Sequence, residues 1–170
     1  MANKVNQAFI DAQNLHLGTT KAMSPWKVDL KRFRVYLDKK YNVKLAYYFL
    51  GSYDASFTDL YNAIQAAGFI LTFREHSSKM IGRKKGNVDT DIVFYIMREL
   101  YKDGDLDKVV LVSGDGDYWR MVDFLIKEDK LLKILFPNRS SASSLYRRLH
   151  PQYFDYLDAD AVKKKIEFVI

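Results

Sequence analysis

Residues 108–119 read KVVLVSGDGDYW, an apolar strand that leads directly into a glycine-rich acidic turn. An unbroken run of valine and leucine is typical of a strand covered on both faces, as in a parallel sheet. The two glycines permit a tight turn, and forming it needs only one of the two aspartates, Asp115 and Asp117. The second acid therefore favours a chemical role for the turn.

On either side of this stretch, apolar runs alternate with amphipathic stretches, which is typical of an α/β domain. The pattern predicts strands at residues 7–11, 44–50, 69–73, 108–113 and 131–136, with a last edge strand at 154–157. It predicts helices at residues 29–41, 57–67, 88–101, 118–128, 143–149 and 160–168. Crossovers of this length imply a mostly parallel sheet with helices on both faces.

Composition narrows the class of protein. A length of 170 residues suits one domain, and the net charge of +6 favours a polyanion such as nucleic acid as the partner. Lys and Arg exceed Asp and Glu by 14 to 7 in residues 1–90, whereas residues 91–170 carry 13 and 14. The absence of cysteine excludes disulfides, thiolate metal sites and cysteine nucleophiles.

Location and assembly are expectations from the same data. No apolar signal segment precedes residue 7, and no run of about 18 apolar residues could span a membrane. We therefore expect a cytoplasmic protein with no membrane partner. The aromatic share of 15% would allow a homodimer.

Acidic side chains stand where a parallel sheet binds ligands, beyond the carboxyl ends of its strands. Asp11 ends the first predicted strand, Asp115 and Asp117 follow the fourth, and Asp89 and Asp91 begin a helix. Crowded carboxylates repel one another unless a hard cation such as Mg²⁺ or Mn²⁺ lies between them. Such cations catalyse phosphodiester hydrolysis. Each acid also has a structural explanation, because Asp11 could form a turn or cap a helix and acids at a helix start favour its dipole.

Four segments together resemble the NYN domains, a PIN-like nuclease group that includes the LabA-like proteins. They are FIDAQNL (9–15), KKGNVDTDIVFYIM (84–97), VLVSGDGDYWRMVDFL (110–125) and SSASSLYRRLHPQYFDYLD (140–158). The resemblance implies a three-layer α/β/α sandwich with a central, mostly parallel sheet of order 3-2-1-4-5. We expect one such domain over residues 1–170, with a core at about 5–158 and a C-terminal helix within 159–170.

The resemblance also implies roles for individual residues. It makes Asp11, Asp89, Asp115 and Asp117 the catalytic acids and ligands of Mg²⁺ or Mn²⁺, in an enzyme that hydrolyses RNA. Asp91 is a weaker candidate than Asp89, because the first acid of the VD-x-D pair is the steadier one in the family. Asn14 matches an asparagine that would orient Asp11 or bind substrate, and Ser113 matches a turn residue near a metal-bound water.

A basic segment precedes the third predicted helix. Residues 74–86 carry a net charge of +4 and lead directly into Asp89, so we expect them to bind RNA phosphates. The candidate contacts are Arg74, Lys79, Arg83, Lys84 and Lys85. A solvated loop without function is the alternative.

Three other functions fit parts of the sequence. The same fold could bind RNA or act as an adaptor without cutting, which tight binding without metal-stimulated cleavage would reveal. A haloacid-dehalogenase-like phosphatase would need an acid two residues after Asp11, where this chain has Gln13. A receiver-like signalling domain would need an acid pair at the end of the first strand, and none stands there.

Overall fold

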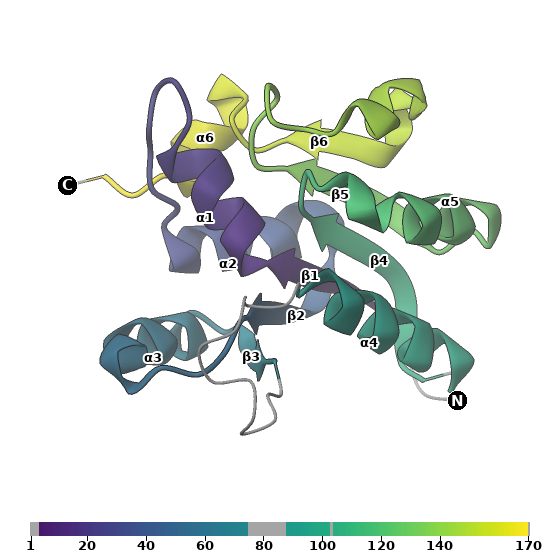
Figure 1. Cartoon of the computed structure of the whole chain (residues 1–170), viewed down its shortest axis with the longest axis horizontal. Coiled ribbons are helices and arrows are strands. Elements are labelled where there is room, and N and C mark those ends of the chain that lie inside the picture. The colour runs from purple at the N-terminus through teal and green to yellow at the C-terminus, as the bar shows by residue number, and fades with distance from the viewer. Residues whose placement is uncertain (1–3, 75–87, 103, 170) are drawn as a thin grey trace.

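A six-stranded parallel sheet forms the centre of the computed structural model, which describes residues 4–74, 88–102 and 104–169. Its strands are β1 (Val5–Asp11), β2 (Val43–Leu50), β3 (Ile70–Phe73), β4 (Leu106–Val112), β5 (Leu131–Phe136) and β6 (Phe154–Tyr156). Their order is β3-β2-β1-β4-β5-β6, and Figure 1 shows them following one another from β3 at the bottom of the view to β6 at the top. The predicted α/β class and the order 3-2-1-4-5 are confirmed. The expected edge strand extends that order, because β6 pairs in parallel with β5.

Helices cover both faces of the sheet and complete the three layers. They are α1 (Ala12–Thr20), α2 (Leu30–Tyr41), α3 (Thr58–Ala66), α4 (Asp89–Tyr101), α5 (Trp119–Lys127) and α6 (Asp160–Ile166). Short 3₁₀ helices lie between them: η1 (Ala55–Phe57), η3 (Gly116–Tyr118), η4 (Ser144–Arg148) and η5 (Pro151–Tyr153). Among the described residues, no helix is both long and apolar enough to cross a membrane.

The alternation of side chains along β1 divides the core into two halves. Ile10 packs in a cluster with residues of α1, α2, α3 and α6. Phe9 points to the other face, in a cluster with residues of α4 and α5. Both side chains are fully buried. Successive residues of a strand point to opposite faces of a sheet, so β1 contributes to both layers.

The sequence pattern did not predict helix α1. Its segment, AQNLHLGTT, buries only Ala12, Leu15 and Thr19 and includes residues of low helix propensity. Two tertiary features hold it. The carboxylate of Asp11 accepts a hydrogen bond from the backbone N–H of Asn14, which caps the helix. Gly18 lies so close to Pro137 that an added Cβ would be 2.7 Å from the proline Cβ.

Register and helix packing bring the acidic segments to one edge of the sheet. Strands β1 and β4 are neighbours, with Ile10 opposite Val112, so Asp11 and Ser113 leave adjacent strands side by side. Helix α4 lies against β1, where the rings of Phe9 and Tyr95 are 6.1 Å apart. The first turn of α4 and the turn after β4 therefore meet beyond the carboxyl end of β1.

Candidate metal centre

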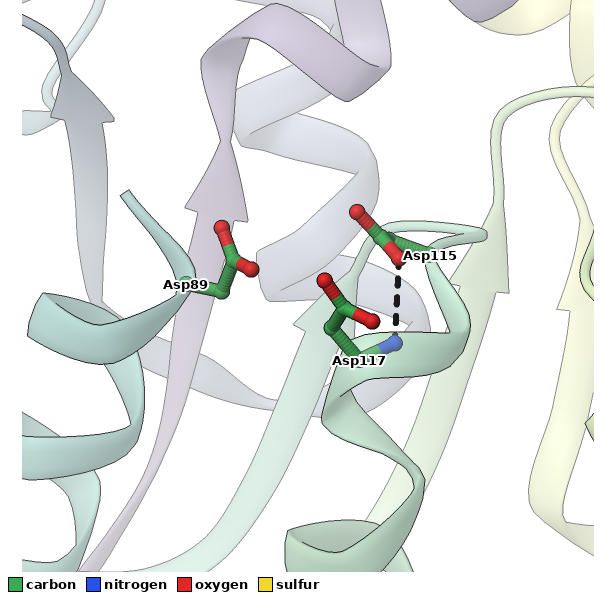
Figure 2. Close-up of side chains that lie close together, drawn as sticks. All are labelled: Asp89, Asp115 and Asp117. Atoms are coloured by element: carbon green, nitrogen blue, oxygen red, sulfur yellow. Dashed lines mark hydrogen bonds between the residues drawn. The ribbon is translucent and has the colours of Figure 1, made fainter. Parts of the chain in front are cut away.

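Three carboxylates from two separate segments converge at this edge. Asp89 lies in the first turn of α4, and Asp115 and Asp117 lie at the start of η3. One carboxylate oxygen of each lies within 4.8 Å of the other two. Figure 2 shows the three side chains pointing toward one another across the gap between α4 and η3. Asp89 is buried, Asp115 is half-buried and Asp117 is exposed, so the cluster opens toward solvent.

The acidic turn is held in shape by its own polar groups. Ser113 Oγ accepts a hydrogen bond from the backbone N–H of Asp115 at 3.1 Å. The carboxylate of Asp115 accepts one from the N–H of Asp117 at 3.0 Å, the bond drawn in Figure 2. Gly116 is packed so closely that an added Cβ would be 3.0 Å from the Cβ of Ser143 and closer still to its hydroxyl. This close packing explains why the second glycine of SGDGD is needed.

Asp11 lies beside the cluster but is held differently. Its side chain is buried at the end of β1, with a relative exposure of 6%. One oxygen accepts the N–H of Asn14, and the other accepts the hydroxyl of Tyr118 at 3.1 Å, with Ser113 Oγ at 3.5 Å. Burial raises the pKa of Asp11, and the negative charge of Asp115 adds to this. Asp11 is not one of the three acids that lie within mutual reach.

Asn14 links helix α1 to the acidic turn. Its side-chain oxygen accepts a hydrogen bond from the backbone N–H of Gly114 at 2.8 Å. The bond to Asp11 comes from the backbone of Asn14, so its amide side chain positions the turn. The expected link between Asn14 and Asp11 therefore exists through the helix cap.

Asp91 is not part of the cluster and forms an ion pair. Its carboxylate lies 3.9 Å from the guanidinium of Arg74, and the Asp91 side chain is 40% exposed. The structure therefore separates Asp91 from Asp89, which buries its side chain two residues earlier in the same turn. Of the basic residues expected to bind RNA, Arg74 is described, and Lys79, Arg83, Lys84 and Lys85 lie outside the described residues.

Burial and mutual repulsion shape the electrostatics of the site. Burial is the main reason that the pKa of Asp89 rises to about 6, and the charges of Asp115 and Asp11 raise it further. The carboxyl group of Asp117 is within hydrogen-bonding range of Asp89 and acts in the same direction. A cation between these groups would relieve the repulsion.

The donor set fits a hard divalent ion. Mg²⁺ binds oxygens at about 2.0–2.1 Å, so ligands in its octahedral shell are about 3 Å apart when adjacent and about 4 Å apart when opposite. The three oxygens lie within 4.8 Å of one another, and small side-chain rotations would bring them within the range of about 3–4 Å that ligands of one ion require. Asp89, Asp115 and Asp117 could therefore hold Mg²⁺ or Mn²⁺, with Asp11 next to them.

A small cleft of about 240 Å³ opens over these acids. It is lined by Asp11, Gln13, Asn14, Leu17, Val88, Asp89 and Asp115. Pockets for drug-sized ligands are commonly about 300–1,000 Å³, so this cleft is on the small side. A cleft of this volume can hold a small ligand or a short part of a longer one.

Two tyrosines support the site, and the sequence pattern did not identify them. Tyr118 is fully buried, and its hydroxyl donates to Asp11. Tyr146 is buried in η4, and its hydroxyl donates to the backbone oxygen of Asp115 at 2.6 Å. Both hydroxyl groups bind partners distant in sequence, so no local spacing could reveal them. Only the position of Tyr118, directly after the acidic turn, was a hint.

Comparisons with known proteins bear on the family and the fold of the chain. The model of the NYN domain family matches residues 7–157. The chain is also similar to the crystal structure of a protein of unknown function from Vibrio parahaemolyticus RIMD 2210633, with 19% identity and a TM-score of 0.68. The match covers 99% of both chains, and at this identity it speaks for the fold alone. No curated protein is significantly similar to the chain.

Proposed function

Because the chain belongs to the NYN domain family of PIN-like nucleases, we propose that it is a metal-dependent nuclease that hydrolyses RNA. One observation carries the proposal. Asp89 and the pair Asp115 and Asp117 come from separate elements, yet their carboxylate oxygens lie within 4.8 Å of one another. Crowding three acids at a half-buried site is unfavourable unless a cation binds there, so the geometry supports a metal centre.

The three acids would hold one or two Mg²⁺ or Mn²⁺ ions. When bound, such an ion neutralises charge on the phosphodiester and makes water a better nucleophile. Asp11 forms the buried wall of the same cleft. Each carboxylate oxygen has two lone pairs, so Asp11 keeps acceptor capacity beyond its bonds to Asn14 and Tyr118.

The remaining residues position the acids and the substrate. Tyr118 and the N–H of Asn14 fix the orientation of Asp11, and the side chain of Asn14 anchors the turn at Gly114. Arg74 lies beside the start of α4, where it pairs with Asp91. We assign to Arg74 and to the basic residues that follow it the binding of RNA phosphates. Charge supports this, because residues 1–90 carry a net charge of +7.

The test is cleavage of labelled RNA and DNA by the wild type and by Asp115→Asn, with Mn²⁺, Mg²⁺ or a chelator. Asparagine keeps the side-chain oxygen that accepts the N–H of Asp117, so the turn should survive the change. We expect metal-dependent cleavage of RNA by the wild type and a loss of at least 100-fold in Asp115→Asn, on the scale of removing an electrostatic catalytic group. Asp123→Asn, on the exposed side of α5, is the matched control and should cut normally.

Two results would contradict the proposal. Full activity in purified Asp115→Asn would show that the clustered acids do not take part in the reaction. Tight RNA binding by the wild type without cleavage under any metal would instead indicate a binding module with the same fold.

A further inference from the structure

A second basic surface lies on the sheet face opposite α4 and α5. Helices α2 and α6 pack together there and border a groove of about 550 Å³. Five cationic side chains line it, with no acid among the lining residues: Lys31, Arg32, Lys39, Lys40 and Lys165. Val35 and Tyr36 form its apolar floor. We call it the α2–α6 groove.

Helical periodicity explains the alignment of the charges. Lys31, Val35 and Lys39 are four residues apart on α2, so they lie along one stripe of the helix. Lys165 joins them from α6. The next residue, Ile166, is fully buried, and its backbone carbonyl accepts a hydrogen bond from the N–H of Asp29. The docking of Ile166 therefore fixes the position of Lys165 against α2.

Most of this charge is not neutralised within the protein. Among the described residues, no carboxylate lies within 4.0 Å of the ammonium groups of Lys31, Lys39 or Lys165. Asp29 lies 4.0 Å from Arg32, and the other acid of this helix, Asp38, pairs with Lys44 at 2.9 Å.

The floor of the groove is also available to a ligand. Val35 is 56% exposed, although Phe33, Tyr36 and Leu37 of the same helix pack into the core. Val35 and Tyr36 therefore form an apolar middle section, with Lys31 and Arg32 one turn before it and Lys39 and Lys40 one turn after it. Such a surface matches a nucleic acid strand, with phosphates at the lysines and sugars or bases against the floor.

We propose that the α2–α6 groove binds the phosphate backbone of RNA at a distance from the acidic cluster. The positions from Lys31 to Lys40 span about 13 Å along the helix. This matches the rise of about four stacked nucleotides. The inference rests on the proposed function only in naming RNA. It implies that the preferred RNA is longer than the short segment that the cleft over the acids can hold.

The test measures binding in a chelator, so cleavage cannot interfere. Fluorescence anisotropy would follow a labelled single-stranded RNA of 20 nucleotides with the wild type and with Lys39→Glu/Lys40→Glu. We expect affinity to fall at least tenfold. If two phosphate contacts are lost, the slope of log K against log salt should become about 1.4 units shallower.

A matched control separates the groove from net charge. Lys102→Glu/Lys127→Glu makes the same change in charge at exposed sites at the ends of α4 and α5, on the opposite face. This control should bind the 20-nucleotide RNA within twofold of the wild type. Acidic residues in the last turn of a helix oppose its dipole. Lys39→Gln/Lys40→Gln therefore serves as a second variant, and its affinity should also fall if the groove binds phosphate.

Specific outcomes would overturn the inference. They are wild-type affinity in both Lys39/Lys40 variants, an equal loss in the control, or lysine-dependent binding to phosphatidylserine vesicles with unchanged RNA binding. The nuclease proposal fails separately. If the wild type never cleaved RNA but the Lys39/Lys40 variants bound RNA more weakly, the groove proposal would stand and the nuclease proposal would fail.

Discussion

Replacing Asp89 by asparagine should stabilise the metal-free protein. The change removes a negative charge that burial and the neighbouring acids disfavour, and it leaves the shape of the side chain nearly the same. The pKa of Asp89 rises from 3.8 to about 6 in the folded chain. Each pKa unit corresponds to about 1.4 kcal/mol, so the charged form costs at most about 3 kcal/mol.

Solvent in the open cleft reduces this cost, and we expect a gain of about 1–2 kcal/mol in the free energy of unfolding for Asp89→Asn. For a chain of this size, the gain corresponds to a rise in Tm of about 3–6 °C at pH 7.5. The assay is thermal unfolding followed by circular dichroism, in the presence of a chelator. Asp123→Asn, at a partly exposed site on α5, is the control and should change stability by less than about 0.5 kcal/mol.

The sign of the pH dependence follows from the direction of the shift. Because the folded pKa of Asp89 is above the unfolded value of 3.8, the charged side chain destabilises the folded wild type above about pH 6. Between pH 6 and pH 4 the folded state takes up the proton first, so this penalty shrinks and is absent below 3.8. The advantage of Asp89→Asn should therefore be complete at pH 7.5 and nearly gone at pH 4. Saturating Mn²⁺ should reverse the order, because an ion that binds only the folded wild type stabilises it.

The reasoning would be refuted if chelated Asp89→Asn were no more stable than the wild type at pH 7.5. A gain in Tm that stayed constant from pH 7.5 to pH 4 would also refute it, because the gain would then come from something other than charge.

Two further changes test how the site is held. Tyr118→Phe removes the hydroxyl that donates to the buried carboxylate of Asp11, so unfolding should cost about 1–2 kcal/mol less and Mn²⁺ affinity, measured by calorimetry, should fall. Unchanged stability and affinity would show that this bond does not matter. Gly116→Ala places a methyl group against Ser143, so chemical denaturation should show a loss of about 1–3 kcal/mol. Adding Ser143→Gly should restore part of the stability lost in Gly116→Ala. If it restored none, the strain would lie at a contact other than Ser143.

The fold was largely predictable because its signals are local. Buried parallel strands contain continuous apolar runs, such as residues 109–112, and helix α2 repeats its apolar residues by turns. Asp11 was named as a possible helix cap, but helix α1 escaped prediction because its segment has low helix propensity and its packing partner Pro137 is distant in sequence. Capping and packing of this kind depend on the assembled sheet.

The candidate site was predictable in outline for a related reason. Acids that follow parallel strands meet at one edge of the sheet, so Asp89 was expected near Asp115 and Asp117. The sequence alone did not reveal that Asp91 turns toward Arg74, or that the second oxygen of Asp11 is held by Tyr118. These contacts depend on side-chain directions, which the spacing of residues in the sequence does not specify.

The central claim is that the clustered aspartates bind a divalent ion. Anomalous diffraction from crystals grown with Mn²⁺ tests it most directly, because the signal locates the metal without assumptions about activity. The account predicts a peak within about 2.5 Å of carboxylate oxygens of Asp89, Asp115 and Asp117. Well-ordered Mn²⁺ elsewhere on the protein, with no peak between these three side chains, would contradict it.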